Sequence, residues 1–413
     1  MDRLLNQDAI QKLKGQHPLC EGKNRDRILF RKSELAGEAN SFTMRCDAQP
    51  SGPRSIYVDA GRILGITEGT EFTMQTPGSD DSASVTVLTV LAVEDLWCTV
   101  QPTPPLEEVP CLDDARAVFY TWRREPMKVV TSLPKLEHLA GERRQIDYAV
   151  TTSTEECDVS LERGTEGWVL ERFDPLTSRY RRRQIFDFSF LSGEVLAAAA
   201  RWNFHLYRFS GPESQSRVLR PITQLHRLKD THTPNSLRPI LLPEGDNLFK
   251  SSNKFEAAVS SYEIHDAVEE ATLHDLAPYY GLTLYNHHIQ DLYAYVFYFN
   301  PSNYSIQLWY APEGNNVGPS LPKRRTDDTP GELTIGYGDG SNSAIKFTIP
   351  DGVETDTGFL KIFVSPLYVN MRSIVQNGIE ALRDGGPSPL PIKSSWDSSV
   401  YVLTCKSPDT ASQ

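Results

Sequence analysis

The chain has 413 residues, of which 39% are hydrophobic and 23% charged, and its formal net charge at pH 7 is −12. This composition is too apolar for a disordered chain, and the length suggests two or three domains that can each bury a core. Because an acidic surface repels phosphate groups, the charge disfavours a general role on nucleic acids or anionic membranes.

No stretch of the chain approaches the roughly 20 consecutive apolar residues that a membrane-spanning helix needs. The first seven residues lack the charged and then apolar layout of a secretory signal peptide. The six cysteines are spread along the chain without CxxC pairs, which is typical of reduced thiols in the cytosol. We therefore expect a soluble, cytoplasmic protein.

Residues 1–24 are predicted to form an N-terminal tail with a short helix that breaks at Gly15 and Pro18. Residues 25–125 then contain short runs rich in β-branched and aromatic residues, separated by clusters of Gly, Pro, Asp and Ser. This pattern predicts a small β-barrel domain. The runs cover residues 28–30, 41–44, 56–58, 71–74, 85–93, 97–100 and 117–122.

Residues 126–210 are predicted to form a small α+β domain, because strand-like runs at 127–130, 148–150 and 168–173 precede one clear helix. The helix is expected over 193–207 with Ser192 as its cap. Its buried face is expected to present Val195, Ala199, Trp202 and Leu206.

Residues 211–413 are predicted to form an antiparallel β-sandwich with a long insertion at about 228–250. The stretch 211–255 is punctuated by Pro and Ser, which favours a linker or an insertion within a sheet. The expected strands cover residues 281–286, 292–299, 304–310, 333–335, 345–349, 359–364 and 400–405. The whole chain is therefore expected to be mostly β with a minor α+β unit.

A catalytic cysteine needs a partner histidine and usually lies at the exposed end of a central strand. Cys98 and Cys405 lie inside strand-like runs, where a buried small side chain is expected. The other four lack a preceding apolar strand and a Gly-rich elbow, and they are Cys20, Cys46, Cys111 and Cys157. We therefore expect no catalytic residue.

The histidines do not pair as metal ligands. His287 and His288 are adjacent and would point to opposite faces of a strand. His226 and His232 lack a Cys or acidic partner at zinc-like spacing, and His205 is interpreted as a boundary residue of the helix. We expect neither a metal site nor a bound cofactor.

The glycine-rich stretch 336–341 superficially suggests a phosphate-binding loop. Such a loop needs a following helix, whose N-terminus supplies amides and dipole. The strand-like run 345–349 follows instead, so the stretch is interpreted as a hairpin turn whose glycines take positive φ.

The basic run 179–183 could bind an anion, but we favour a solvated strand or turn balanced by nearby Glu and Asp. The aromatic run 293–299, together with Trp309 and Tyr310, could form a recognition face. We favour a sandwich core in which both faces of the run are partly buried, because aromatic residues dominate cores as much as interfaces.

Several segments also form a pattern that known proteins share. They are 20–22 with 26–30, 57–61 with 65–72, 199–206, 292–299 with 304–306, 333–338 and 356–363. This set resembles the region that follows the peptidase domain in caspase-like, metacaspase-type proteins of mushroom-forming fungi. Residues 57–72 look like that family's small β-domain, 199–206 like its helix, and the later segments like its C-terminal sandwich. The similarity runs from about residue 16 to the C-terminus.

In that family a caspase-type fold precedes this region and carries the catalytic His and Cys. Only about 20 residues precede the similar region here, too few for such a domain, so the resemblance assigns no catalytic residue. It implies a non-catalytic accessory or regulatory protein that acts through protein–protein contacts, with a caspase-like subunit as the expected partner.

Two alternatives stay open. The chain could be a fragment of a caspase-like cysteine endopeptidase whose catalytic domain is missing from it. It could also be a small-ligand or glycan-binding sandwich that uses Trp309 and Tyr310.

Overall fold

The computed structural model describes residues 41–47, 55–75, 86–105, 115–121, 123–134, 136, 148–153, 157–210, 219–231, 240–252, 260–264, 268–312, 318–338, 344–350, 352–376 and 395–407. Contacts divide the chain into two units, 1–36 and 37–413, and all of the described residues belong to the second. The expected N-terminal helix and the run 28–30 lie outside the described residues.

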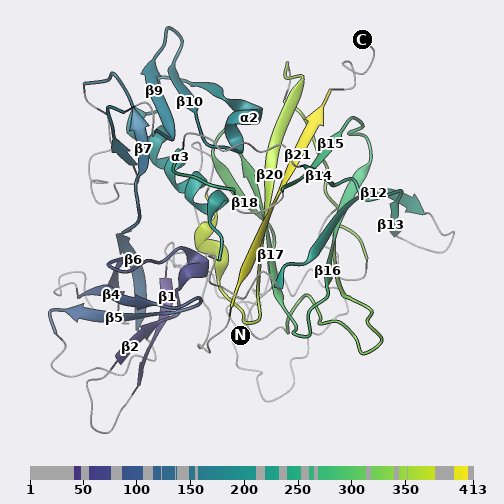
Figure 1. Ribbon diagram of the computed structural model, residues 1–413, viewed down its shortest axis with the longest axis horizontal. Coiled ribbons are helices and arrows are strands. Elements are labelled where there is room, and N and C mark those ends of the chain that lie inside the picture. The colour runs from purple at the N-terminus through teal and green to yellow at the C-terminus, as the bar shows by residue number, and fades with distance from the viewer. Residues whose placement is uncertain are drawn as a thin grey trace, which may run out of the picture. The chain divides into compact units, whose positions relative to one another are not determined.

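The first six strands form a closed antiparallel barrel, as the sequence predicts (Figure 1). Around the barrel they run in the order β1-β2-β5-β4-β3-β6. Alternate side chains such as Val58, Phe72 and Cys98 point inward and are fully buried. The strands are β1 (Ser41–Asp47), β2 (Ser55–Val58), β3 (Glu71–Gln75), β4 (Val87–Val93), β5 (Cys98–Thr103) and β6 (Arg116–Thr121).

The expected turn between β2 and β3 contains the short 3-10 helix η2 (Arg62–Leu64). Its backbone N–H groups at Arg62 and Ile63 donate to the carbonyl oxygens of Glu94 and Asp95, both at 2.9 Å. A Cβ at Gly61 would lie 2.5 Å from backbone atoms of Glu94 and Leu96. Glycine is therefore needed where this turn crosses the β4–β5 connection.

The middle of the chain forms a five-stranded sheet in the order β11-β10-β9-β7-β8, with β7 parallel to both β8 and β9. The strand-like runs predicted at 127–130, 148–150 and 168–173 correspond to β7, β8 and β10. Strands β9 and β11 and the short helix α2 were not predicted. The elements are β7 (Met127–Val130), β8 (Tyr148–Val150), β9 (Val159–Arg163), β10 (Trp168–Arg172), α2 (Thr177–Arg181), β11 (Arg183–Phe186) and α3 (Ser192–Tyr207).

Helix α3 begins one residue earlier than the sequence predicts. Leu191 is the N-cap and Ser192 is the first helical residue, so Ser192 as the cap was wrong. The Glu194 carboxylate accepts a hydrogen bond from the Leu191 backbone N–H at 3.1 Å, which satisfies a donor that the first turn leaves open. The predicted buried face is confirmed, because Val195, Ala199, Trp202 and Leu206 are all buried.

Two further sheets follow, one of four strands (β13-β12-β16-β19) and one of six (β14-β15-β21-β20-β17-β18). The strands of the first are β12 (Ile222–Thr231), β13 (Ile240–Glu244), β16 (Tyr279–Asn286) and β19 (Gly331–Ile335). Those of the second are β14 (Lys250–Ser252), β15 (Val268–Leu273), β17 (Tyr293–Asn300), β18 (Ser305–Tyr310), β20 (Thr355–Ser365) and β21 (Asp397–Lys406). The 3-10 helix η4 (Met371–Ile374) lies between β20 and β21 in the chain.

Three expectations for this region were wrong. The stretch 211–255, expected as a linker or insertion, contains β12, β13 and β14; Pro221 directly precedes β12, and the 10 residues of β12 include no proline that would break it. The sheets are not purely antiparallel, since β15 pairs with β21 in parallel. The run 345–349 is no strand, because only Ile345 forms a bridge, to Tyr280.

The six-stranded sheet is covered on both faces. Leu360 and Ile362 of β20 share a core with Leu282 of the four-stranded sheet. The alternate residues Phe359 and Phe363 point the other way, into a core that includes α3. Because both faces of the sheet are covered, every residue from Thr357 to Ser365 is buried. A strand with one face in water would show alternating buried and exposed residues instead.

The buried His205 of α3 makes stability depend on pH. Burial and the charges of Arg208, Arg201 and Arg124 hold its pKa well below the usual value. The unfolded chain therefore binds a proton below about pH 6.5 that the folded chain excludes, and stability falls as pH drops, by at most about 1.4 kcal/mol per unit.

We expect His205→Gln to make the free energy of unfolding less sensitive to pH between about 6.5 and 5, because it removes this group. Urea unfolding at several pH values measures that slope directly. His274→Gln, at an exposed histidine, is the matched control and should leave the slope unchanged. Equal slopes in the wild-type and His205→Gln proteins would contradict the assignment.

Candidate functional site

The three buried cysteines in the described part of the chain lie in settings that suppress their reactivity. Cys98, Cys157 and Cys405 are buried and Cys46 is half-buried. Burial raises the pKa of all three buried thiols, that of Cys405 to about 12. The nearby carboxylates of Asp59, for Cys98, and Asp356, for Cys405, add to the effect. A nucleophilic cysteine needs the opposite shift. Cys20 and Cys111 lie outside the described residues.

The described histidines and acids do not converge on a common centre. No group of three or more His, Cys, Asp or Glu side chains in the described ranges is placed to hold a metal ion. His226 lies 3.1 Å from Gln224 Oε1, and the backbone N–H of Gln290 donates to Nδ1 of His288. His287 and His288 were expected on a strand, but they follow β16 in a loop.

Two arginines of the basic run 179–183 are paired with glutamates, in line with the expected balance by nearby acids. Arg182 lies 2.7 Å from Glu171, and Arg179 lies 3.8 Å from Glu270, which also accepts a hydrogen bond from Tyr180 at 2.6 Å. The run spans the end of α2 and the start of β11. Two of the four arginine charges of the run are therefore paired within the fold.

The aromatic run 293–299 contributes to a hydrophobic core on each face of its strand, which agrees with the interpretation as a core and not as a recognition face. Phe297 and Phe299 point towards α3, whereas Val296 points towards the four-stranded sheet. Trp309 is half-buried and stacks on Tyr298 with ring centroids 4.7 Å apart, and Tyr310 is also half-buried. Gly336 and Gly338 take positive φ, as predicted, but the expected hairpin is wrong, because β19 is not followed by a strand at 345–349.

Two exposed aliphatic side chains lie two residues apart on β13. Ile240 is 45% and Leu242 48% exposed, and because alternate residues of a strand share a face, both point to the same side. The register places Thr231 and Lys229 of β12 beside them. Among the described strands β13 pairs only with β12, so it is an edge (Figure 1). We call Ile240, Leu242, Thr231 and Lys229 the β12–β13 surface.

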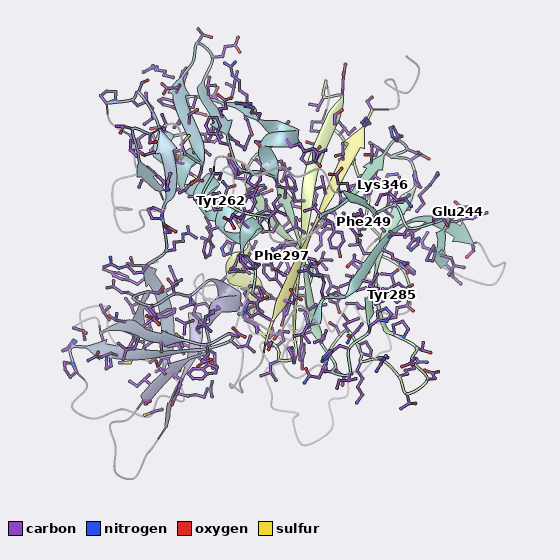
Figure 2. The ribbon with its side chains drawn as sticks, viewed as in Figure 1. Glu244, Phe249, Tyr262, Tyr285, Phe297 and Lys346 are labelled. Carbon is purple, nitrogen blue, oxygen red and sulfur yellow. The ribbon has the colours of Figure 1, made fainter. Side chains whose placement is uncertain are left out.

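The chemistry of this edge favours side-chain contact over strand addition. Pro243 has no N–H, so the edge lacks a donor at that position, a common protection against pairing with another strand. Lys229 lies 3.6 Å from Glu244, which Figure 2 labels on β13. Exposed ion pairs of this kind contribute little stability, and they leave a polar rim beside the two aliphatic side chains.

Sequence reasoning missed this surface because the stretch around it was interpreted as an insertion. A signal was present: the apolar triplet 240–242 lies between Pro239 and Pro243, which is typical of a short edge strand.

No protein-family model matches the chain, and neither a curated protein nor a solved structure matches it. In the described part of the chain no helix is long and apolar enough to cross a membrane.

The buried thiols predict a site-specific pattern of alkylation. With a pKa of about 12, the Cys405 thiol is only about 0.1% thiolate at pH 9. We expect Cys98 and Cys405 to stay unmodified by iodoacetamide in the native protein at that pH, and Cys46 to react faster than either because it is partly accessible. Peptide mass spectrometry, with a urea-denatured sample as reference, measures this. Equal rates for Cys405 in both samples would contradict its burial.

Proposed function

We propose that the chain is a non-catalytic accessory or regulatory protein that acts through protein–protein contacts and docks to a caspase-like subunit. The observation that carries this proposal is the β12–β13 surface, where two aliphatic side chains remain about half exposed on an edge strand with a polar rim. Apolar anchors surrounded by polar groups are the usual layout of a protein interface.

The identity of the partner rests on the resemblance to the region that follows the peptidase domain in caspase-like proteins. The described segments that carry it lie in the barrel, in α3 and in the last two sheets. The division into a barrel, an α+β domain and a C-terminal sandwich, and a cytoplasmic location, are parts of the same proposal. The raised pKa values of the buried thiols are compatible with a binding role.

The test is a binding titration of the full chain against an immobilised caspase-like peptidase domain from a mushroom-forming fungus. Burying the exposed halves of Ile240 and Leu242 is worth about 1 kcal/mol each. The double variant Ile240→Ser, Leu242→Ser should therefore weaken binding about 30-fold.

The matched control is Ile289→Ser, since Ile289 is 68% exposed but lies in the loop between β16 and β17. It should bind as the wild type does. Failure of the wild type to bind the peptidase domain would overturn the proposed partner. Unchanged affinity of the double variant would instead show that the contact lies elsewhere on the protein.

A further inference from the structure

Arg208 is a charged residue that the fold buries. It directly follows α3 as the C-cap residue of this helix, and it is only 9% exposed. Its backbone N–H donates to the Phe204 carbonyl oxygen at 3.2 Å, and its backbone carbonyl accepts a hydrogen bond from the Ser398 hydroxyl at 3.2 Å. These two bonds tie the backbone of Arg208 to α3 and to β21, so the point from which its side chain extends is fixed.

None of the three guanidinium nitrogens of Arg208 has a hydrogen-bond partner among the described residues. A guanidinium carries five N–H donors and stays protonated in proteins. Burying such donors without acceptors is unfavourable, and more so when the group is charged. An arginine at the end of a helix often donates to the last carbonyl groups of that helix, but the side chain of Arg208 makes no such bond. Helix capping therefore does not explain why this side chain is charged and buried.

Three aromatic rings lie close to this guanidinium. Its central carbon is 5.0 Å from the ring centroid of Phe363, 5.8 Å from that of Phe204 and 5.9 Å from that of Trp396. The turn after η2 also comes close, since a Cβ at Gly65 would lie 2.8 Å from Nη1 of Arg208. Aromatic faces attract a cation, but the guanidinium N–H groups point outward in its own plane and still need acceptors. The rings therefore favour the charge and leave its hydrogen bonds unmade.

The described charges around Arg208 do not balance it. Burial and the like charge of Arg124 lower the pKa of Arg208 to about 9, and no described carboxylate forms an ion pair with it. Asp397 lies next to Trp396 in the chain, but it lies 3.4 Å from Arg220 and accepts a hydrogen bond from the Ser398 N–H at 2.7 Å. That carboxylate is thus engaged by another arginine, and the charge of Arg208 stays without a counter-charge in the described part of the chain.

The indole of Trp396 supplies a second buried donor beside the guanidinium. Trp396 is 1% exposed, and its Nε1–H has no hydrogen-bond partner among the described residues. An indole N–H can only donate, so an acceptor is needed to satisfy it. The Trp396 ring is held against Phe363, with centroids 6.0 Å apart. A guanidinium and an indole N–H that are both buried and both lack an acceptor form a donor set suited to an anion.

We propose that Arg208 and Trp396 bind a small inorganic anion of the size of chloride. The anion would accept charge-assisted hydrogen bonds from the guanidinium and one hydrogen bond from the indole N–H, and its charge would offset that of Arg208. Because both residues are almost fully buried, a small ion fits the site better than an organic anion does. Water is the competing occupant, since it would accept the same bonds but leave the charge unbalanced. The site shares no residue with the β12–β13 surface and does not depend on the proposed protein contact.

The first test replaces sodium gluconate by sodium chloride in a solution of the full chain, at constant ionic strength so that charge screening does not change. Proton–nitrogen correlation NMR follows the indole N–H signals, and Trp396→Phe assigns that of Trp396. This signal should shift with chloride and reach saturation, whereas that of the partly buried Trp309 should not. A Trp396 signal that does not respond to chloride would overturn the proposal in favour of water. Sulfate that binds as tightly as chloride would overturn the assignment of a chloride-sized ion.

The second test is Arg208→Met, which keeps an unbranched side chain and removes its charge and donors. Chloride affinity, measured from the rise of the unfolding temperature with chloride concentration, should fall about tenfold or more, because a hydrogen bond to a charged group is lost. The matched control is Arg183→Met, at an exposed arginine, which should bind chloride as the wild type does. An unchanged chloride dependence in Arg208→Met would overturn the proposal. If this variant does not fold, the NMR titration of the wild type decides the question by itself.

Discussion

The indole of Trp202 lies against three aromatic rings at once. Its ring centroid is 5.6 Å from that of Phe299, 5.8 Å from Phe359 and 5.7 Å from Tyr304, all in edge-to-face geometry. Phe299 and Phe359 belong to the face of the six-stranded sheet that the four-stranded sheet does not cover. Helix α3 therefore supplies the cover for this face, which would otherwise expose a large apolar patch to water. The core of the C-terminal half is incomplete without residues 192–207.

A buried charge also connects the middle sheet to the six-stranded sheet. Arg172 of β10 is fully buried and donates hydrogen bonds to the Pro301 carbonyl oxygen at 3.0 Å and to the Arg181 carbonyl oxygen at 2.9 Å. Its guanidinium carbon lies 5.0 Å from the ring centroid of Tyr304. The turn between β17 and β18 is thus held by the middle sheet. A buried arginine with these partners fixes geometry more than it adds stability, since its desolvation offsets much of the gain.

Asp158 likewise holds the segment 260–264 against the middle sheet. Its carboxylate accepts hydrogen bonds from the Lys128 backbone N–H, from the Ser260 hydroxyl and from both the N–H and the hydroxyl of Ser261, at 2.7 to 2.9 Å. Residues 260–264 are therefore tied to β7 and β9. This tie positions Tyr262, whose ring stacks on Tyr207 of α3 with centroids 4.9 Å apart.

The parts of the fold that could be predicted are those with local signals. The barrel strands show period-2 alternation between turn residues, and the face of α3 follows from helical spacing alone. β12 and β13 were missed because nearby prolines suggested a break, and the parallel pair β15 and β21 because about 130 residues separate its strands and no local pattern reports such pairing. Arg208 and Trp396 lie far apart in the sequence, so only the folded chain brings the two donors of the proposed anion site together.

The central claim is that α3 and the six-stranded sheet share one core through Trp202. Native-state hydrogen exchange on Trp202→Ala in the full chain tests it most directly, because a buried Trp→Ala change costs about 3–5 kcal/mol. We predict that amide protection falls together, by at least about a hundredfold, in α3, β17 and β20. Loss of protection in α3 alone, with β17 and β20 at wild-type values, would contradict the claim.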